Sequence, residues 1–242
     1  MNNNIVAFIP ARSGSKRLKN KNIKKINNQP LIFWTVFKSL KSKMFKKVIF
    51  SSDSLEYFNL LLKILKKKNI DISKLIFDHR SKNDSSDNKK IFEYVKNSLP
   101  IKQKLTQKDL IALLLPTAPL RKIKTIKKVV DISLKTKKDV FTANSFEMSI
   151  KYAIIKQKKN WIPSYKKSPL LTGDTRSQDQ QKYLRPNPVC CCLWVKNFNR
   201  NKRSIYNNSL LYETDKLESI DIDTKEDFLI ADLLMRSLDE NT

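Results

Sequence analysis

The sequence predicts a doubly wound α/β fold with a mostly parallel sheet, a class in which ligands bind beyond the carboxyl ends of the strands. Short apolar stretches alternate with segments of helical period along most of the chain. The stretch 110-LIALLLPTAPLR-121 is a continuous apolar run, as expected of a strand buried on both faces of a parallel sheet. With 242 residues, the chain has the length of one large domain or of one domain with a sizeable insertion.

The expected elements follow one another from the N-terminus. A strand at 5–9 precedes a helix at 31–40, in which Leu31, Trp34 and Phe37 recur at three-residue spacing. Further strands are expected at 47–53, 75–77, from 110 up to the proline-bracketed turn of LIALLLPTAPLR, at 139–144 and at 189–195. Further helices are expected at 55–65, 91–99, 123–134 and around 228–238.

The stretch from about residue 145 to residue 187 interrupts this alternation. It contains several prolines and the polar run 172-TGDTRSQDQQK-182. This composition predicts an insertion that projects from the sheet and has too little local core to stand alone. We therefore expect a single domain over residues 1–242 that carries this insertion.

Composition limits the classes of protein. The formal net charge of +26 would by itself favour a nucleic-acid-binding protein. The lysines are spread over the polar faces of several predicted helices, however, so a solvated surface is favoured over a dedicated nucleic-acid face. No apolar run approaches the roughly 18 residues of a membrane span, and the first residues lack the pattern of a signal peptide. We expect a cytoplasmic protein that binds no membrane.

Scarce residue types exclude several kinds of site. The chain has two glycines, Gly14 and Gly173, so neither the Walker loop nor the dinucleotide fingerprint can be written. His79 is the single histidine, which excludes a multi-histidine metal site. The three consecutive cysteines at 190–192 would alternate between the faces of a strand, so we expect them to be small apolar residues without a chemical role.

The stretch 10-PARSGSKRLKNKN-22 places cations and small residues directly after the first strand. Gly14, flanked by Ser13 and Ser15, could let backbone N–H groups converge on an anion, and cationic side chains could close over it. A triphosphate fits this description. A solvated basic loop explains the pattern about equally well.

Asp221 and Asp223 form the second candidate site. Carboxylates two residues apart on an extended segment point to the same side, where they could share one Mg²⁺. Asp223 could instead cap the helix that Thr224 begins, and Thr224 with Asp227 resembles a capping box. Capping accounts for one aspartate but not for the pair.

Four stretches resemble, in order, the motifs of the acylneuraminate cytidylyltransferases: IPARSGSKRLKNKNIK, LLLPTAPLR, TRSQDQQKYLRPN and SIDIDTKEDFLIA. The family makes CMP-sialic acid and related CMP-activated nonulosonic acids, and the resemblance extends from residue 5 to about residue 235. It implies a Rossmann-like nucleotidyltransferase that forms a homodimer through the insertion. The anion of the first loop would be the triphosphate of CTP.

The resemblance also implies a role for each matching residue. Arg12 and Lys21 would stabilise charge on the departing pyrophosphate, and Asp221 and Asp223 would bind Mg²⁺. Arg176, Gln178 and Asp179 would fall in the segment that contacts the sugar and the second subunit, where Ser177 replaces a frequent arginine. The implied nucleotide-binding residues are Ala11, Arg12, Ser13, Gly14, Ser15, Lys16, Lys21, Asn22, Arg80 and Asp87, and the implied sugar-binding residues are Lys151, Arg176 and Gln178.

The chain departs from the family pattern at several positions. Leu115 replaces a frequent glutamine of the nucleotide site, and Lys19 replaces a proline of the opening loop. Pro188 and Cys191 replace a glycine and a tyrosine in the sugar half of the site. A wall formed by Cys190, Cys191 and Leu193 would be less polar and less aromatic than usual. It would favour legionaminic- or pseudaminic-type sugars over N-acetylneuraminic acid.

The expected reaction is the transfer of CMP from CTP to the anomeric hydroxyl of an acidic nine-carbon sugar, with release of pyrophosphate. Two alternatives remain: a basic nucleic-acid-binding protein, favoured by the charge alone, and a CTP-binding relative whose catalysis is impaired by the changes at Pro188 and Cys191. Stabilisation by CTP with Mg²⁺ would separate the first alternative from the enzyme.

Overall fold

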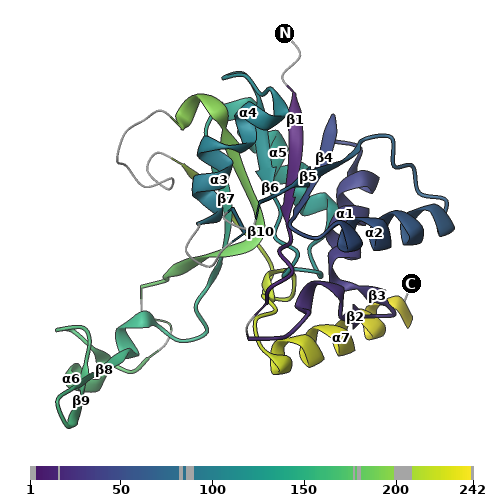
Figure 1. Ribbon diagram of the computed structural model, residues 1–242. Helices are drawn as coiled ribbons and strands as arrows, with labels where there is room; N and C mark the ends of the chain where they lie inside the picture. Colours follow the sequence, from purple (N-terminus) through teal and green to yellow (C-terminus); the bar gives the residue numbers. More distant parts are fainter. Residues whose placement is uncertain are drawn as a thin grey trace.

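A computed structural model describes residues 4–15, 17–81, 84–85, 90–176, 178, 181–198 and 209–240. Seven strands form one sheet in the order β11-β7-β10-β6-β1-β4-β5 (Figure 1). Six of them are mutually parallel, and β10 runs antiparallel to both of its neighbours. The mostly parallel sheet confirms the predicted fold class. The strands are β1 (Ile5–Pro10), β4 (Lys47–Ser52), β5 (Leu75–His79), β6 (Leu110–Leu113), β7 (Val140–Ser145), β10 (Leu184–Trp194) and β11 (Leu210–Glu213).

Helices cover both faces of the sheet, and the first strand shows why. Ala7 and Ile9 point into the core cluster that α1 (Leu31–Ser42), α2 (Leu55–Lys67) and α5 (Ile123–Thr136) share. Val6 and Phe8 alternate with them and pack into a second cluster on the opposite face. That cluster contains side chains of α3 (Ile91–Asn97) and α4 (Leu99–Gln103). A continuous apolar strand is therefore buried on both faces.

The C-terminal helix α7 (Lys225–Glu240) lies beside a small hairpin near the N-terminus, formed by β2 (Lys25–Ile26) and β3 (Gln29–Pro30) (Figure 1). Ala231 and Met235 of the helix pack against Ile26 and Ile222 in a third apolar cluster. This packing brings the segment before α7 next to the loop that follows β1.

Three expected elements differ from the structure. The helix predicted at 91–99 is divided into α3 and α4, because Pro100 has no N–H to continue the first helix and begins a second one. The strand predicted from residue 110 ends at Leu113, and the rest of that apolar run is a buried loop. The cysteine strand begins at Leu184, so it already pairs with β7 within the stretch predicted as the insertion. β11 was not predicted.

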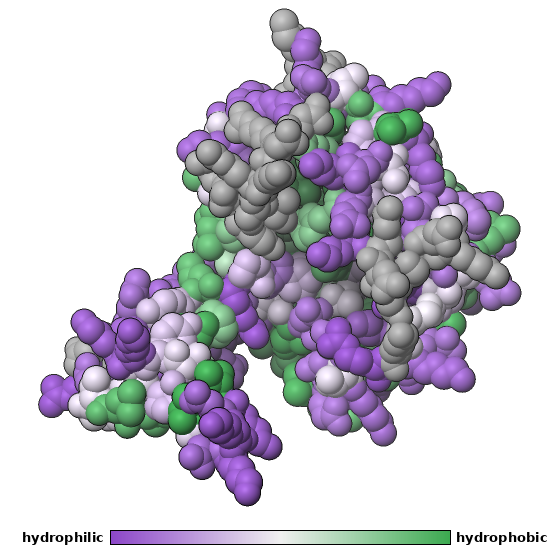
Figure 2. Space-filling view, turned by 60° about the vertical axis from the view of Figure 1, so that its left-hand side comes forward, coloured by the Kyte–Doolittle hydropathy of each residue, from purple (hydrophilic) through white to green (hydrophobic). Residues whose placement is uncertain are grey.

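The insertion projects from the body of the molecule, as predicted, and we call residues 146–176 the projecting arm (Figures 1 and 2). It contains the hairpin of β8 (Ile154–Gln157) and β9 (Asn160–Pro163) and the short helix α6 (Pro169–Thr172). Between residues 153 and 176 only Ser168 and Pro169 are buried. The arm therefore has almost no core of its own.

The surface in Figure 2 shows hydrophilic side chains spread over both the body and the arm. On α2 and α5 the lysines occupy exposed positions along the outer faces, as expected for amphipathic helices. None of the helices in the described ranges combines the length and the apolar character that a membrane crossing requires.

Candidate active site

One carboxylate holds the loop after β1 against the neighbouring strand. Asp53, which follows β4, accepts a hydrogen bond from the backbone N–H of Ser13 and another from its hydroxyl group, each at 2.8 Å. The N–H of Ala11 donates to the carbonyl oxygen of Ser51 at 2.8 Å. Because β1 and β4 are parallel neighbours, loop 11–15 begins at the carboxyl edge of the sheet, where ligands bind in this fold class. Sequence analysis did not identify Asp53, although the polar end of its strand was a signal.

Asp53 remains a good acceptor because its pKa is lowered. Burial acts to raise this pKa, but the two hydrogen bonds from Ser13 and the charge of Arg80 outweigh that effect. The ionised carboxylate therefore holds the loop through Ser13, and its charge also acts on Arg80.

Gly14 does not have the conformational role expected of it. Its φ angle lies outside the positive range that favours glycine, and a Cβ placed there would meet no atom within 4 Å. The backbone of the protein therefore does not require glycine at this position. Asn22 has a larger part in shaping the loop: it is 6% exposed, and its Nδ2 donates to the carbonyl oxygen of Arg12 at 2.8 Å.

Arg80 lies buried where β5 ends, and it is 4% exposed. Its Nη2 donates to the carbonyl oxygen of Ser51 at 3.3 Å, while its Nε has no hydrogen-bond partner within the described ranges. Burial lowers the pKa of Arg80, Asp53 acts to raise it, and Arg12 is close enough to lower it further. Two guanidinium groups that influence each other in this way are typical of a site for a multiply charged anion.

The loop after β1 and the segment before α7 meet at Asp223. Lys21 donates from Nζ to Asp223 Oδ1 at 3.1 Å and to the carbonyl oxygen of Ile222 at 2.6 Å. Arg17 pairs with the same carboxylate oxygen at 3.0 Å, although its side chain is 70% exposed and the pair is therefore weak. The N–H of Ile222 donates to the carbonyl oxygen of Thr117, which fixes this segment to the loop after β6. Sequence analysis did not predict either cation as a partner of Asp223.

The helix cap is formed by other residues than Asp223. Thr224 and Asp227 exchange hydrogen bonds as in a capping box, with the Asp227 carboxylate also accepting from the N–H of Asp223. This confirms the predicted capping box. The Asp223 side chain points instead to the cations, so capping does not explain its presence.

Asp221 has a raised pKa. Although part of the residue is exposed, the surrounding protein disfavours the charged carboxylate, and the nearby Asp223 adds to this effect while a hydrogen bond from Thr117 opposes it. A neighbouring pair of carboxylates could share a divalent cation. Across the described ranges, no group of three or more His, Cys, Asp or Glu side chains forms a metal site made by the protein alone.

A cavity of about 230 Å³ lies between Asp221 and the first half of β10. Cys190 and Cys191 line it, whereas Leu193 is 2% exposed and does not: it is packed within the apolar cluster to which Leu113 and Cys191 of the lining also belong. Burial raises the pKa of the Cys191 thiol, which makes it an apolar wall rather than a reactive group.

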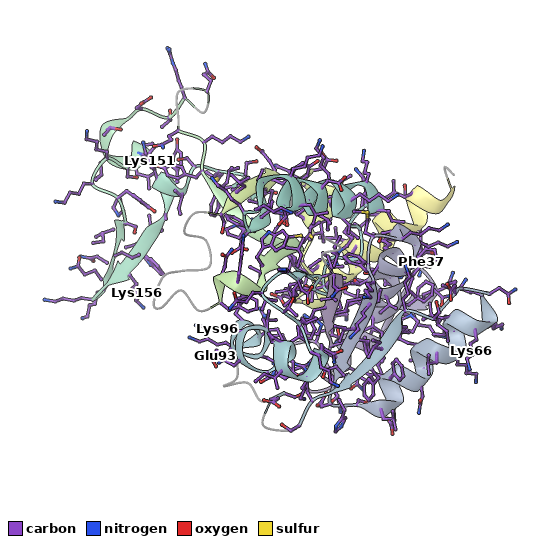
Figure 3. All side chains as sticks on the ribbon, turned by 90° about the horizontal axis from the view of Figure 1, so that it is seen from above. Phe37, Lys66, Glu93, Lys96, Lys151 and Lys156 are labelled. Carbon is purple, nitrogen blue, oxygen red and sulfur yellow. The ribbon has the colours of Figure 1, made fainter. Side chains whose placement is uncertain are left out.

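The three predicted sugar-binding residues of the insertion lie apart from this cavity. Lys151 belongs to the short helix η2 (Ile150–Tyr152) at the base of the arm, and Figure 3 shows it on the arm, away from the body. Arg176 and Gln178 follow α6, and both are exposed. None of the three is among the described side chains that line the cavity. The predicted residues Lys16, Asp87, Ser177 and Asp179 fall outside the described part of the chain.

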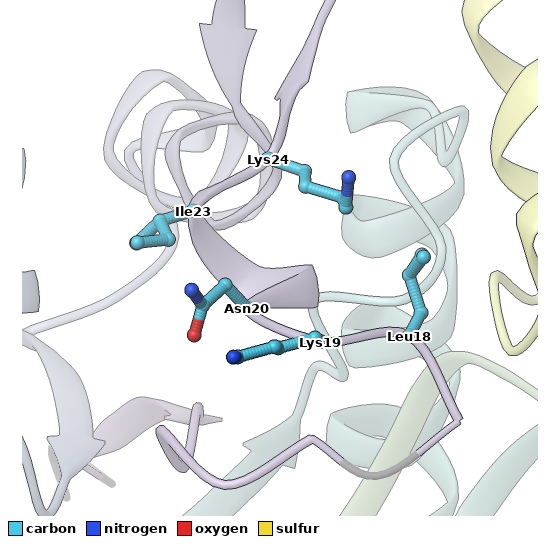
Figure 4. A pocket seen from close by; sticks show the side chains of 5 residues that line it. All are labelled: Leu18, Lys19, Asn20, Ile23 and Lys24. Atoms are coloured by element: carbon cyan, nitrogen blue, oxygen red, sulfur yellow. The ribbon is translucent and has the colours of Figure 1, made fainter.

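A second, open hollow of about 530 Å³ borders the loop after β1 (Figure 4). Its lining includes Leu18, Lys19 and Asn20, and Lys19 and Asn20 extend toward the same side. Lys19, the residue that departs from the family's proline, therefore adds a cation beside the loop.

The structures of two cytidyl-transferring enzymes resemble this fold. The structure of CMP:2-keto-3-deoxy-manno-octonic acid synthetase complexed with CTP matches with a TM-score of 0.65 and 15% sequence identity, over 97% of this chain and 99% of that one. The 4-diphosphocytidyl-2C-methyl-D-erythritol synthase of Anaerococcus prevotii matches with a TM-score of 0.63 and 15% identity, over the same shares. These two likenesses place the chain in the fold class that both enzymes share.

Within that class, the chain belongs to the cytidylyltransferase family, whose sequence profile matches residues 6–208. An N-acylneuraminate cytidylyltransferase of Escherichia coli is 31% identical over 96% of this chain, which spans 52% of that longer protein. A CMP-N,N'-diacetyllegionaminic acid synthase of Legionella pneumophila is 29% identical over 96% of both chains. A pseudaminic acid cytidylyltransferase of Campylobacter jejuni is 31% identical over 73% of this chain and 72% of that one.

The ion pairs of Asp223 predict an effect on nucleotide binding. In the absence of divalent metal, Asp223→Asn should tighten the binding of CTP by up to about fivefold, because Lys21 and Arg17 lose their anionic partner and can turn to the phosphates. Titration calorimetry in EDTA measures this affinity. Asp215→Asn, which breaks an exposed ion pair with Lys122 elsewhere, is the matched control and should change nothing. Equal or weaker binding by Asp223→Asn would contradict the prediction.

The raised pKa of Asp221 predicts an effect on stability. A carboxyl group whose pKa is higher in the folded state stabilises the fold below its unfolded pKa, and this contribution is lost as the pH rises through the folded pKa. At pH 7 the ionised Asp221 therefore costs stability, and Asp221→Asn should raise the Tm. The difference should vanish below about pH 4, where the wild-type carboxyl is protonated. Calorimetry across this pH range measures the Tm of both proteins. A lower Tm of the variant at pH 7 would contradict the prediction and show that the charge of Asp221 stabilises the fold.

Proposed function

We propose that this protein transfers CMP from CTP to the anomeric hydroxyl group of an acidic nonulosonic sugar and releases pyrophosphate. The observation that carries the proposal is the convergence of Arg12, Lys21 and Arg80 at one edge of the sheet, beside the Asp221–Asp223 segment and the apolar cavity. The names of three relatives add support. Each name combines CMP or cytidylyl transfer with a sugar acid: N-acylneuraminate, N,N'-diacetyllegionaminic acid or pseudaminic acid.

The residues of the loop would act mainly by position and charge. The sugar hydroxyl oxygen forms a bond to the α-phosphorus of CTP as the bond from that phosphorus to the pyrophosphate oxygen breaks. Arg12 and Lys21 would oppose the negative charge that grows on the departing pyrophosphate. Asp53 and Asn22 would keep the loop in one shape before the nucleotide arrives, so that little ordering is needed on binding.

We further propose that Asp221 and Asp223 hold Mg²⁺. Protein sites for this ion commonly supply one or two carboxylates and leave the remaining positions to water and substrate phosphates, which fits a pair of carboxylates beside a cationic loop. When bound, the ion would neutralise phosphate charge and help position the nucleotide. Asp223 would then exchange Lys21 and Arg17 for the metal, and both cations would become available to the phosphates.

The cavity supports a preference among the sugars. Its wall is apolar through Cys190, Cys191 and Leu115, which suits the methyl and acylamino groups of legionaminic- and pseudaminic-type acids better than a hydroxyl-rich tail. Phe92 and Phe141 also line the cavity, so it contains two aromatic side chains besides this apolar wall. Both rings come from elements outside the motif in which sequence analysis placed the wall.

Pyrophosphate release from CTP, measured with a panel of three acids, tests the activity and the sugar together. We expect kcat/KM to be higher for a legionaminic or pseudaminic acid than for N-acetylneuraminic acid.

Asp221→Asn and Asp223→Asn should each lower kcat by roughly 10²-fold or more. CTP with Mg²⁺ at 100 times its Kd should raise the Tm by roughly 5–10 °C, from about 2.7 kcal/mol of linked stabilisation. Stabilisation by RNA without release of pyrophosphate would favour the nucleic-acid-binding alternative, and stabilisation by CTP alone would favour an impaired relative.

We also propose that two copies of the chain form a homodimer in which each projecting arm helps to complete the partner's sugar site. The arm exposes several large apolar side chains that its own few buried residues cannot cover, among them Trp161 at 64% and Leu171 at 62%. Lys151 and Arg176, the cations that could meet the sugar carboxylate, lie on or beside this arm rather than at the cavity of their own chain. A symmetric pair would satisfy both conditions.

Light scattering should give twice the chain mass of 28.3 kDa. Leu171→Asp should shift the protein toward the monomer and reduce kcat/KM for the sugar by an order of magnitude or more, since a charge would be buried in the interface. Ile101→Asp, at a 79% exposed position of α4, introduces the same charge outside the arm and should leave the mass and the activity unchanged. A fully active monomer at working concentration would refute the dimer.

A further inference from the structure

The ladder between β10 and β7 is interrupted beside the candidate sugar cavity. Pro186 pairs with Ala143 and Cys191 pairs with Phe141, so the four residues 187–190 of β10 oppose the single residue Thr142 of β7. We call residues 187–190 the β10 bulge. Asn187, Pro188 and Cys190 of this bulge line the cavity that Asp221 also borders. The conformation of the bulge therefore sets one wall of the cavity.

A buried hydroxyl group on β7 forms hydrogen bonds with the bulge. Thr142 is 0% exposed, and its Oγ1 accepts a hydrogen bond from the N–H of Cys190 at 3.0 Å. The same hydroxyl lies 2.6 Å from Asn187 Oδ1, to which it can donate its proton. Asn187 Oδ1 also accepts from the N–H of Val189 at 3.2 Å, and its Nδ2 donates to Thr214 Oγ1 at 2.8 Å. The side chain of Thr142 thus replaces ladder contacts that the interruption removes.

Arg121 holds the opposite side of the bulge. It is 0% exposed, and its Nη2 donates to the carbonyl oxygens of Leu115 and Pro188, the latter at 3.1 Å. Leu115 and Pro188 both line the cavity, so one buried guanidinium ties two of its walls together. A guanidinium group donates hydrogen bonds and accepts none, so Arg121 contacts the backbone of Pro188 through its carbonyl oxygen. Burial lowers the pKa of Arg121 to about 10, which leaves it a cation at neutral pH.

We infer that Thr142 and Arg121 are positioning residues that fix the distance between the β10 bulge and Asp221, and through it the fit of the acidic sugar. Neither side chain lines the cavity, so both act through the bulge rather than by touching the substrate. The inference rests on the proposed function, because it takes the cavity to be the sugar site. It assigns sugar selectivity to residues of β7 and of the loop after β6, outside the bulge itself.

Thr142→Val tests the inference with almost no change of shape. The variant leaves the N–H of Cys190 without its acceptor, and the Asn187 amide oxygen keeps only the N–H of Val189. The KM for the sugar should therefore rise about tenfold, while the KM for CTP stays within about twofold. Thr35→Val is the matched control: Thr35 is 1% exposed on α1, and its hydroxyl has no hydrogen-bond partner within the described ranges. This control should leave both KM values unchanged. Arg121→Lys keeps the charge but loses the planar guanidinium group whose Nη2 reaches both carbonyls, and should act in the same direction as Thr142→Val.

The test depends on whether the KM for the sugar and the KM for CTP change by different factors. A purely structural hydroxyl would lower the Tm of Thr142→Val and leave the sugar KM as it was, and that result overturns the positioning role. An equal rise in both KM values also overturns it, because the bulge would then not be specific to the sugar. If the wild-type protein transfers CMP to none of the acids, the proposed function fails, and the inference fails with it. Should Arg121→Lys not fold, the Thr142→Val result stands alone.

Discussion

The contact of Lys21 with Asp223 joins two parts of the chain that are 202 residues apart, and the candidate active site depends on it. The loop after β1 and the segment before α7 would otherwise be independent surface features. The third apolar cluster supports this contact, because it contains Ile26 and Ile222, which are close in sequence to Lys21 and Asp223 respectively. In the absence of ligand the pair also keeps a carboxylate and an ammonium group from being left unpaired in a partly buried site.

Strand direction explains why the other parts of the site meet at the same edge. The carboxyl ends of β1, β4 and β5 bring the loop, Asp53 and Arg80 together, because parallel strands end on one side of the sheet. β10 reaches this edge by the opposite route. It is antiparallel to β6 and β7, so its first half, rather than its last, lies beside their carboxyl ends. A cavity wall is thus built from the beginning of one strand and the ends of the others.

The extreme charge of the chain has little influence on this architecture. The lysines of the helices lie on outer faces, and the apolar clusters on either side of the sheet contain the residues that decide the fold. The scarcity of glycine has little influence either. The left-handed backbone position that ends a helix often contains glycine, but α1 and α5 end there with Lys43 and Lys137, at φ angles of 58° and 57°. Local strain of this kind is tolerated where packing of the helix supplies the stability.

The sequence by itself determined what depends on local pattern. The alternation of strands and helices, the capping box of Thr224 and Asp227 and the cationic loop all follow from residue spacing, because neighbours along the chain set these features. Only the tertiary structure decided which side chains meet. Asp53 contacts Ser13 across 40 residues, and Thr142 contacts Cys190 across 48. Periodicity reports which face of an element is buried, but it carries no information on which distant strand ends beside it, and so these contacts could not be read from the sequence.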